Sequence, residues 1–251
     1  MDENLKKCKK LLRLLISRTK NLNFEQHNEM QALTISFYRK MLSSAHAILK
    51  LERDNYNACI LASHMMEGLI LLVWCLDNPK ERIRQYVEYG AIEYIEGLQV
   101  YPEERDNLLQ LIKTKNIQRF LKKDVQKRPI TDEVLLNKGN YYNTWYKPEA
   151  NTINDIVEKL VKSRGSTGIA NIKNMYDKLC AYKHYSPYIM LPRFGTKMKI
   201  PNFDEKFAIL SALQCLYSTF LYVNMLQPHQ ENIDDITEKY KHIEGVSWVK
   251  F

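Results

Sequence analysis

Apolar side chains recur at steps of three and four residues along most of the chain, which is the spacing of one face of an α-helix. The pattern predicts helices at about 5–16, 25–51, 56–76, 80–98, 103–123, 151–163, 169–184 and 204–226. The 251 residues include only 8 Gly and 8 Pro, which leaves little material for the many tight turns of an all-β fold. The sequence therefore predicts an all-α fold, a multi-helix bundle.

One region departs from the helical pattern. Residues 127–148 contain the helix breakers Pro129, Gly139 and Pro148 together with a cluster of tyrosines and a tryptophan. Elsewhere the chain has no internal repeat, low-complexity tract or clean linker. We therefore expect a single α-helical domain over 1–251, with a core bundle at about 25–98 and 151–228 and an irregular basic and aromatic insertion at about 124–150.

The most apolar segment raises the question of a membrane. Residues 207–226 carry no charge over about twenty positions, which is long enough to span a bilayer. Ser211, Gln214, Ser218 and Tyr222 recur within it at helical steps, so they fall on one face. This pattern is typical of a buried helix with a polar stripe, and we expect no membrane insertion.

The cysteines bear on the compartment. Their number is odd, 5, they are widely spaced, and none forms a CxxC pair. They are expected to be buried thiols in a reducing compartment, without a disulfide framework or a zinc site. No secretory signal is evident, because Arg13 and Arg18 interrupt the apolar run near the start. The prediction is a cytoplasmic protein with no cofactor and no metal.

The charge balance favours a polyanionic partner. The chain has 37 Lys and Arg against 29 Asp and Glu, a net charge of +8. Basic residues alternate with aromatic ones near the insertion, as in grooves for single-stranded nucleic acid. Lys122, Lys123, Arg128 and Trp145 are the candidate RNA contacts there. The alternative is a solvated helix face beside a loop packed by its own aromatics.

Two segments carry a resemblance to known proteins. One runs from Ser63 through Glu67 to Asn78-Pro79 and Tyr86, and the other is Tyr176-Asp177-Lys178-Leu179-Cys180-Ala181-Tyr182-Lys183-His184-Tyr185-Ser186-Pro187. Together they resemble a family of helical prokaryotic proteins classed as a domain of unknown function. That family in turn is similar to the HEPN helical bundles, many of which are metal-independent RNases of toxin–antitoxin and anti-phage systems.

The resemblance implies a site and a mechanism. The HEPN hallmark is Arg, four to six residues, then His; here Lys178 stands in the place of the arginine and His184 in that of the histidine. His184, Lys178 and Glu67 are the candidate catalytic residues, since a histidine near neutral pH can act as base or acid and a lysine can stabilise phosphorane charge. The further candidates for substrate contact are Tyr176, Tyr182, Lys183 and His64.

Each of these residues also has a structural interpretation. His184 could cap the end of a helix, where a partly cationic ring is favourable. Glu67 lies on the most apolar helix, three positions after His64, so a carboxylate there needs a partner: His184, a nearby cation, or a hydrogen bond within the bundle. Lys178 and Lys183 could be solvated surface charges.

Two classes of function follow. The first is a HEPN-like metal-independent endoribonuclease, a toxin or anti-phage defence effector, which the resemblance implies to be a homodimer. The second is a non-catalytic RNA- or nucleotide-binding or protein-interaction module of a prokaryotic defence system. RNA is the expected ligand of the first class, and RNA, a nucleotide or a partner protein is the expected ligand of the second. A defence-system or antitoxin protein is the expected partner.

Overall fold

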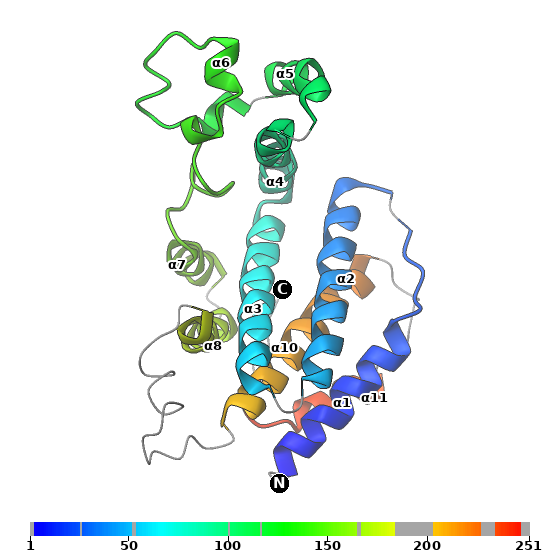
Figure 1. Ribbon diagram of the computed structural model, residues 1–251. Helices are drawn as coiled ribbons and strands as arrows, with labels where there is room; N and C mark the ends of the chain where they lie inside the picture. Colours follow the sequence, from blue (N-terminus) through cyan, green and yellow to red (C-terminus); the bar gives the residue numbers. More distant parts are fainter. Residues whose placement is uncertain are drawn as a thin grey trace. The chain divides into compact units, whose positions relative to one another are not determined.

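The computed structural model describes residues 3–25, 27–51, 54–99, 101–115, 117–164, 167–183, 203–226 and 234–246. In this part of the chain the fold is all-α, as predicted (Figure 1). The α-helices are α1 (Glu3–Thr19), α2 (Glu29–Lys50), α3 (Asn55–Asp77), α4 (Pro79–Glu93), α5 (Arg105–Thr114), α6 (Asp132–Leu135), α7 (Ile153–Arg164), α8 (Thr167–Lys183), α10 (Phe203–Leu226) and α11 (Asp234–Lys241). Short 3-10 helices are η1 (Tyr94–Gln99), η2 (Pro102–Glu104), η3 (Ile117–Phe120) and η4 (Lys138–Asn140).

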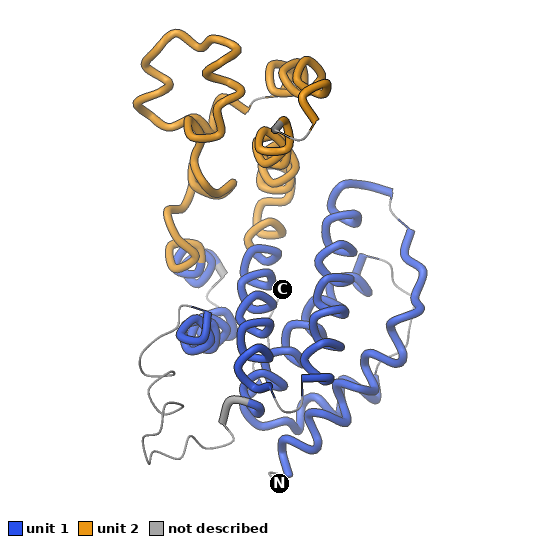
Figure 2. The backbone as a smooth tube through the Cα atoms, viewed as in Figure 1, with its two compact units in different colours: residues 1–73, 157–251 blue, residues 74–156 orange. Residues whose placement is uncertain are grey.

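The chain divides into two compact units (Figure 2). The first consists of residues 1–73 and 157–251, and the second of residues 74–156. The division falls within α3 and α7, so both helices contribute to each unit. The insertion expected at about 124–150 lies in the second unit.

The first unit is built around α10, which packs along α2 and α1. The polar stripe predicted for α10 is confirmed: Ser211, Gln214, Ser218 and Tyr222 are all buried. The apolar stripe predicted for α1, from Leu5 to Ile16, is buried as well. Core formation by apolar helix faces therefore accounts for this unit.

Among the described residues, two helices are long and apolar enough to cross a membrane by length and composition alone. They are α3 and residues Glu205–Leu226 of α10, and 61% and 78% of their most apolar windows are buried within the protein. Core helices of a bundle show the same composition because they are surrounded by other apolar faces.

The second unit combines α4 with short helices and irregular chain. Leu121 and Tyr141 form an isolated antiparallel bridge, and Tyr142 N–H donates to the Phe120 carbonyl at 2.9 Å. Tyr141 is buried and its hydroxyl donates to the Leu135 carbonyl at 2.8 Å. These contacts tie the irregular region to η3 and α6.

Two expectations about helices are wrong. A continuous helix was expected at 103–123, but α5 ends at Thr114 and Lys115 has extended backbone. The step of five residues from Ile112 to Ile117 would turn the second apolar set about 140° away from the first on a straight helix. The chain bends instead, and Ile117 and Phe120 become fully buried.

The second error concerns the segment after residue 226. No helix was predicted there, but the segment contains α11, whose Ile236 and Tyr240 are buried. Most residues of this eight-residue helix are hydrophilic. Its two apolar residues lie four positions apart on one face, which is too short a pattern to predict a helix from periodicity.

Candidate functional site

The helices α3 and α8 bring together residues from the two segments that carry the family resemblance. Lys183 Nζ, at the end of α8, lies 3.1 Å from Glu67 Oε2 on α3. His64 is three residues before Glu67 and therefore shares its face of the helix. Lys40 of α2 interacts electrostatically with His64. We call His64, Glu67, Lys183 and Lys40 the α3–α8 cluster.

The α3–α8 cluster affects the protonation of His64. Partial burial lowers the pKa of the His64 imidazole below its usual range, and the positive charge of Lys183 lowers it further. Glu67 opposes this change, and Lys40 adds to it. The imidazole is therefore neutral at pH 7 and has a lone pair that can accept a proton.

Glu67, whose position on an apolar helix predicted a partner, is paired with the Lys183 cation. The Glu67 and Lys183 side chains are half-buried, with 26% and 30% of their surface exposed. At this exposure the pair keeps access to solvent and to a ligand. Its net charge is close to zero, so the excess positive charge of the cluster comes from Lys40.

Tyr182 holds the end of α8 against α3. The Tyr56 hydroxyl donates to the Tyr182 carbonyl at 2.8 Å, and the two rings lie 6.1 Å apart. Only 6% of Tyr182 is exposed, so its ring face is covered by protein and does not offer a stacking surface for a base. Tyr176, one turn and a half earlier, is half-buried.

Lys178 lies apart from the α3–α8 cluster. Its Nζ is 5.4 Å from the centroid of the Phe207 ring on α10, a cation–π contact. Lys183 lies five positions after Lys178 in the sequence, so the two lysines point about 140° apart around α8. His184, the residue that follows Lys183, lies outside the described residues.

The candidate RNA contacts near the insertion have individual partners. Lys122 Nζ donates to the Gly139 carbonyl at 2.6 Å, and Arg128 lies 3.8 Å from Asp124. Trp145 is buried, with its ring edge-on to Tyr86 and to Tyr146. Trp145 therefore belongs to the core of the second unit, as the alternative of a loop packed by its own aromatics implies.

Lys123 is placed differently. It lines a hollow of about 410 Å³ in the second unit, together with Arg119, Tyr142, Lys147 and Glu149. The hollow has charges of both signs, so the field within it is mixed. A polyanion would meet Glu149 as well as the lysines.

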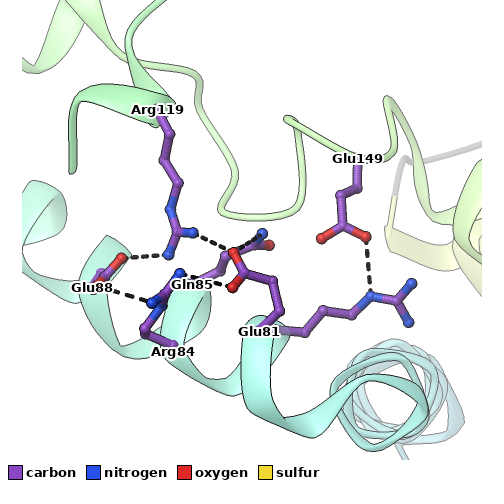
Figure 3. Close-up of polar contacts among 7 residues, drawn as sticks. Glu81, Arg84, Gln85, Glu88, Arg119 and Glu149 are labelled. Carbon is purple, nitrogen blue, oxygen red and sulfur yellow. Dashed lines mark hydrogen bonds and ion pairs between the residues drawn. The ribbon is translucent and has the colours of Figure 1, made fainter. Parts of the chain in front are cut away.

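An ionic network that the sequence did not reveal lies beside this hollow (Figure 3). The Arg119 guanidinium binds Glu81 and Glu88, which lie seven residues apart on one face of α4. Only 8% of the Glu88 side chain is exposed. The signal in the sequence was the spacing of Glu81 and Glu88, which places them on one helix face. The sequence near these glutamates does not indicate which arginine pairs with them.

Arg82 forms the other half of the network. Its guanidinium lies over the Trp74 ring, 3.1 Å from the centroid, and donates to the Trp74 carbonyl at 3.0 Å. Asp77 accepts from the same group at 2.8 Å and Glu149 at 3.1 Å. Because both arginines are occupied by carboxylates, the network connects α4 to the irregular region and leaves little charge for a ligand.

Within the described ranges, no group of three or more His, Cys, Asp or Glu residues is arranged to hold a metal ion. The residues of the α3–α8 cluster also have an unsuitable composition, with a single carboxylate that is already paired to a lysine. The chemistry that these residues can perform is proton transfer and charge stabilisation.

The fold and the α3–α8 cluster define an all-α protein whose polar site joins α2, α3 and α8. The chain belongs to a family of unknown function (DUF5677), whose model matches residues 31–199. This range includes His64, Glu67 and Lys183. No curated protein and no solved structure matches the chain.

Proposed function

We propose that this protein is a metal-independent endoribonuclease whose site is the α3–α8 cluster. The observation that carries the proposal is the 3.1 Å contact between Lys183 and Glu67, which joins the two segments similar to HEPN RNases. A neutral histidine lies beside this contact. The proposed setting is that of a toxin or anti-phage effector.

The reaction is an internal transesterification of RNA. The 2′-oxygen attacks the adjacent phosphorus while a base removes the 2′-hydroxyl proton. The bond from phosphorus to the 5′-oxygen breaks, and an acid protonates that oxygen. The products are a 2′,3′-cyclic phosphate and a free 5′-hydroxyl, so no oxidant, metal or second substrate is consumed.

The residues of the cluster divide these tasks. His64, neutral at pH 7, is the proposed base. Lys183 supplies positive charge for the phosphorane oxygens, and Glu67 is a positioning residue that holds the Lys183 ammonium. His184, next in the sequence, is assigned the role of acid from the resemblance.

A second candidate function has its own support. Lys178, in the place of the HEPN arginine, contacts Phe207 instead of the cluster, and Glu67 neutralises Lys183. Both features favour a non-catalytic RNA- or nucleotide-binding module, because they reduce the charge available to a transition state. For the enzyme, the resemblance implies a homodimer.

The test is cleavage of total RNA and tRNA in EDTA by the wild type, His64→Ala, His184→Ala and Glu67→Gln. His64→Ala should lower the rate about 10²–10⁴-fold, the usual contribution of a general base or acid. The matched control is His27→Ala, because His27 is exposed and its ring lies 2.8 Å from the carboxylate of neighbouring Glu25, away from the cluster residues in sequence. End-group mapping should find 2′,3′-cyclic phosphates.

The pH profile provides a readout that a structural role would not change. Because the pKa of His64 is lowered, the acidic limb of kcat/KM should inflect below about 6.5, the ordinary histidine value. The limb should move toward that value in Lys183→Met, which removes a charge that lowers the pKa. Equal cleavage by the wild type and His64→Ala would refute the assignment, and absence of cleavage with retained RNA binding would favour the second function.

A further inference from the structure

A second hollow lies between α1 and α2 in the first unit, and its surroundings are strongly basic. Its volume is about 570 Å³. The polar residues that line it can all donate hydrogen bonds or carry positive charge. They are Arg13 and Ser17 of α1, Lys20 directly after α1, and Arg39, Ser43, His46 and Lys50 of α2.

The helical register arranges these side chains in two stripes. On α2 the four polar residues follow steps of four, three and four, which places them on one face over a length of about 16 Å. The three residues on and directly after α1 follow steps of four and three. A strand of a nucleic acid duplex advances about 3.4 Å per nucleotide, so the stripe on α2 can meet several consecutive phosphates.

Three of the cations in this hollow, Lys20, Arg39 and Lys50, are not paired with a carboxylate in the part of the chain that the structure describes. No described Asp or Glu lines the hollow. On the same helix α1, by contrast, Arg18 binds Asp235 and Lys9 binds Glu205. A group of exposed cations without carboxylates attracts an anionic ligand.

The remaining residues of the hollow indicate which anion fits. Its other lining residues are aliphatic: Ile16 is buried, and Leu42 and Leu49 are half-buried. No aromatic side chain lines the hollow, so it offers no platform for stacked bases. Its concave form, without aromatic side chains, suits a chain of phosphates better than a flat membrane surface.

We infer that this hollow binds the phosphate backbone of RNA, an inference that rests on the proposed function for the identity of the ligand. Arg39, in the hollow, and Lys40, in the α3–α8 cluster, are adjacent in α2 and therefore lie about 100° apart around the helix. The hollow and the cluster thus occupy neighbouring faces of α2. A strand held by Lys20, Arg39 and Lys50 can continue toward His64.

The test measures binding of a fluorescent 2′-O-methyl RNA, which cannot be cleaved because its 2′-hydroxyl is blocked. The variant is Lys20→Gln/Arg39→Gln/Lys50→Gln. Its Kd should rise at least about tenfold, and the slope of log K against log salt should fall by about 2, for three lost phosphate contacts at about 0.7 each. Circular dichroism should match the wild type, since the three side chains are exposed.

The matched control is Lys80→Gln/Lys115→Gln/Lys162→Gln, which removes the same charge from exposed positions outside the hollow. Its Kd should change less than threefold. An equal loss of RNA affinity in both triple variants, or no loss of RNA affinity in the hollow variant, would overturn the inference. Loss of binding to phosphatidylserine vesicles with unchanged RNA binding would also overturn it, in favour of a membrane surface.

The uncleavable probe separates this inference from the proposed function. RNA binding that depends on the hollow, without any cleavage of ordinary RNA, would leave the inference intact and refute the enzyme. If the triple variant binds and cleaves RNA as well as the wild type does, the inference about the hollow is refuted and the proposed enzyme is retained.

Discussion

Arg119 belongs to a basic run between Lys113 and Arg128 that suggested a surface for nucleic acid. In the structure its guanidinium is held by Glu81 and Glu88, and only 15% of its side chain is exposed. The same charge therefore stabilises the second unit instead of facing a ligand. Lys113, 2.6 Å from Asp132, has a similar role at the surface.

We predict that Arg119→Met destabilises the second unit by roughly 2–4 kcal/mol, because it leaves Glu88 buried without its main cation. Adding Glu88→Gln to Arg119→Met should recover part of the loss, since the uncompensated charge is then removed. Urea unfolding followed by tryptophan fluorescence measures this, and Trp74 and Trp145 both lie in this unit. A double variant less stable than Arg119→Met would contradict the assignment.

The same network gives a pH dependence. Burial raises the pKa of Glu81, but hydrogen bonds from Gln85 and Arg119 and the nearby arginine charges outweigh it, so the net shift is downward. A lowered carboxyl pKa contributes stability that is present above the unfolded value, about 4.3, and is lost as the pH falls through the folded value. The difference between the wild type and Arg119→Met should therefore shrink below about pH 4.

Among the elements, α11 depends most clearly on tertiary contacts. An isolated helix of eight residues is unstable in water. Tyr217 of α10 holds it in two ways: its ring stacks on Tyr240 at 4.0 Å, and its hydroxyl donates to Thr237 at 2.9 Å. The stability of α11 is therefore supplied by α10.

We predict that Tyr240→Ala costs about 3–5 kcal/mol of unfolding free energy, the usual range for removing a buried aromatic ring. Tyr240→Phe keeps the stacked ring and should cost less than about 1.5 kcal/mol. Chemical denaturation monitored by circular dichroism compares the two. Similar losses in both variants would show that the ring contact is not what holds α11.

Periodicity predicted most of the helices because it is a local property. The expected helices at 5–16, 25–51, 56–76, 151–163 and 204–226 correspond to α1, α2, α3, α7 and α10. Periodicity failed where an apolar set changed face, at Ile112 to Ile117, and where only two anchors marked a helix, in α11. Asn78 precedes α4 with Pro79 in its first turn, and the Asn78 side chain makes no capping hydrogen bond.

At the scale of the whole molecule, the cysteines report on the integrity of both units. No disulfide joins any of the five, and Cys8, Cys59, Cys75 and Cys215 are buried, as predicted for thiols of a helical core. Burial raises the pKa of Cys75 to about 12 and also raises that of Cys215. Buried thiols with raised pKa values react slowly.

We predict that Ellman's reagent modifies one thiol in the native protein, the partly exposed Cys180, and all five after unfolding in guanidinium. Cys180→Ser should abolish the fast reaction in the native state without changing the unfolding midpoint by much. Rapid modification of two or more thiols under native conditions would contradict the packing of the units.

The candidate site shows where prediction from the sequence ended. Glu67 was singled out because a carboxylate on an apolar helix needs a partner, and that requirement is visible in the sequence alone. The sequence does not show which residue is that partner. Lys178 and Lys183 are both near His184 in the chain, and only Lys183 contacts Glu67. Their difference of five positions on α8 decides which lysine faces α3.

The sequence by itself determined the all-α class, the uncharged core helix with its buried polar stripe, and the need of Glu67 for a partner. These follow from helical spacing and from the cost of burying charge, which act within one segment. Only the tertiary structure decided that Arg119 serves Glu81 and Glu88, that Trp145 is core, and that α1 and α2 form a basic hollow. Such contacts depend on which helix faces meet, because charges interact across space and not along the chain.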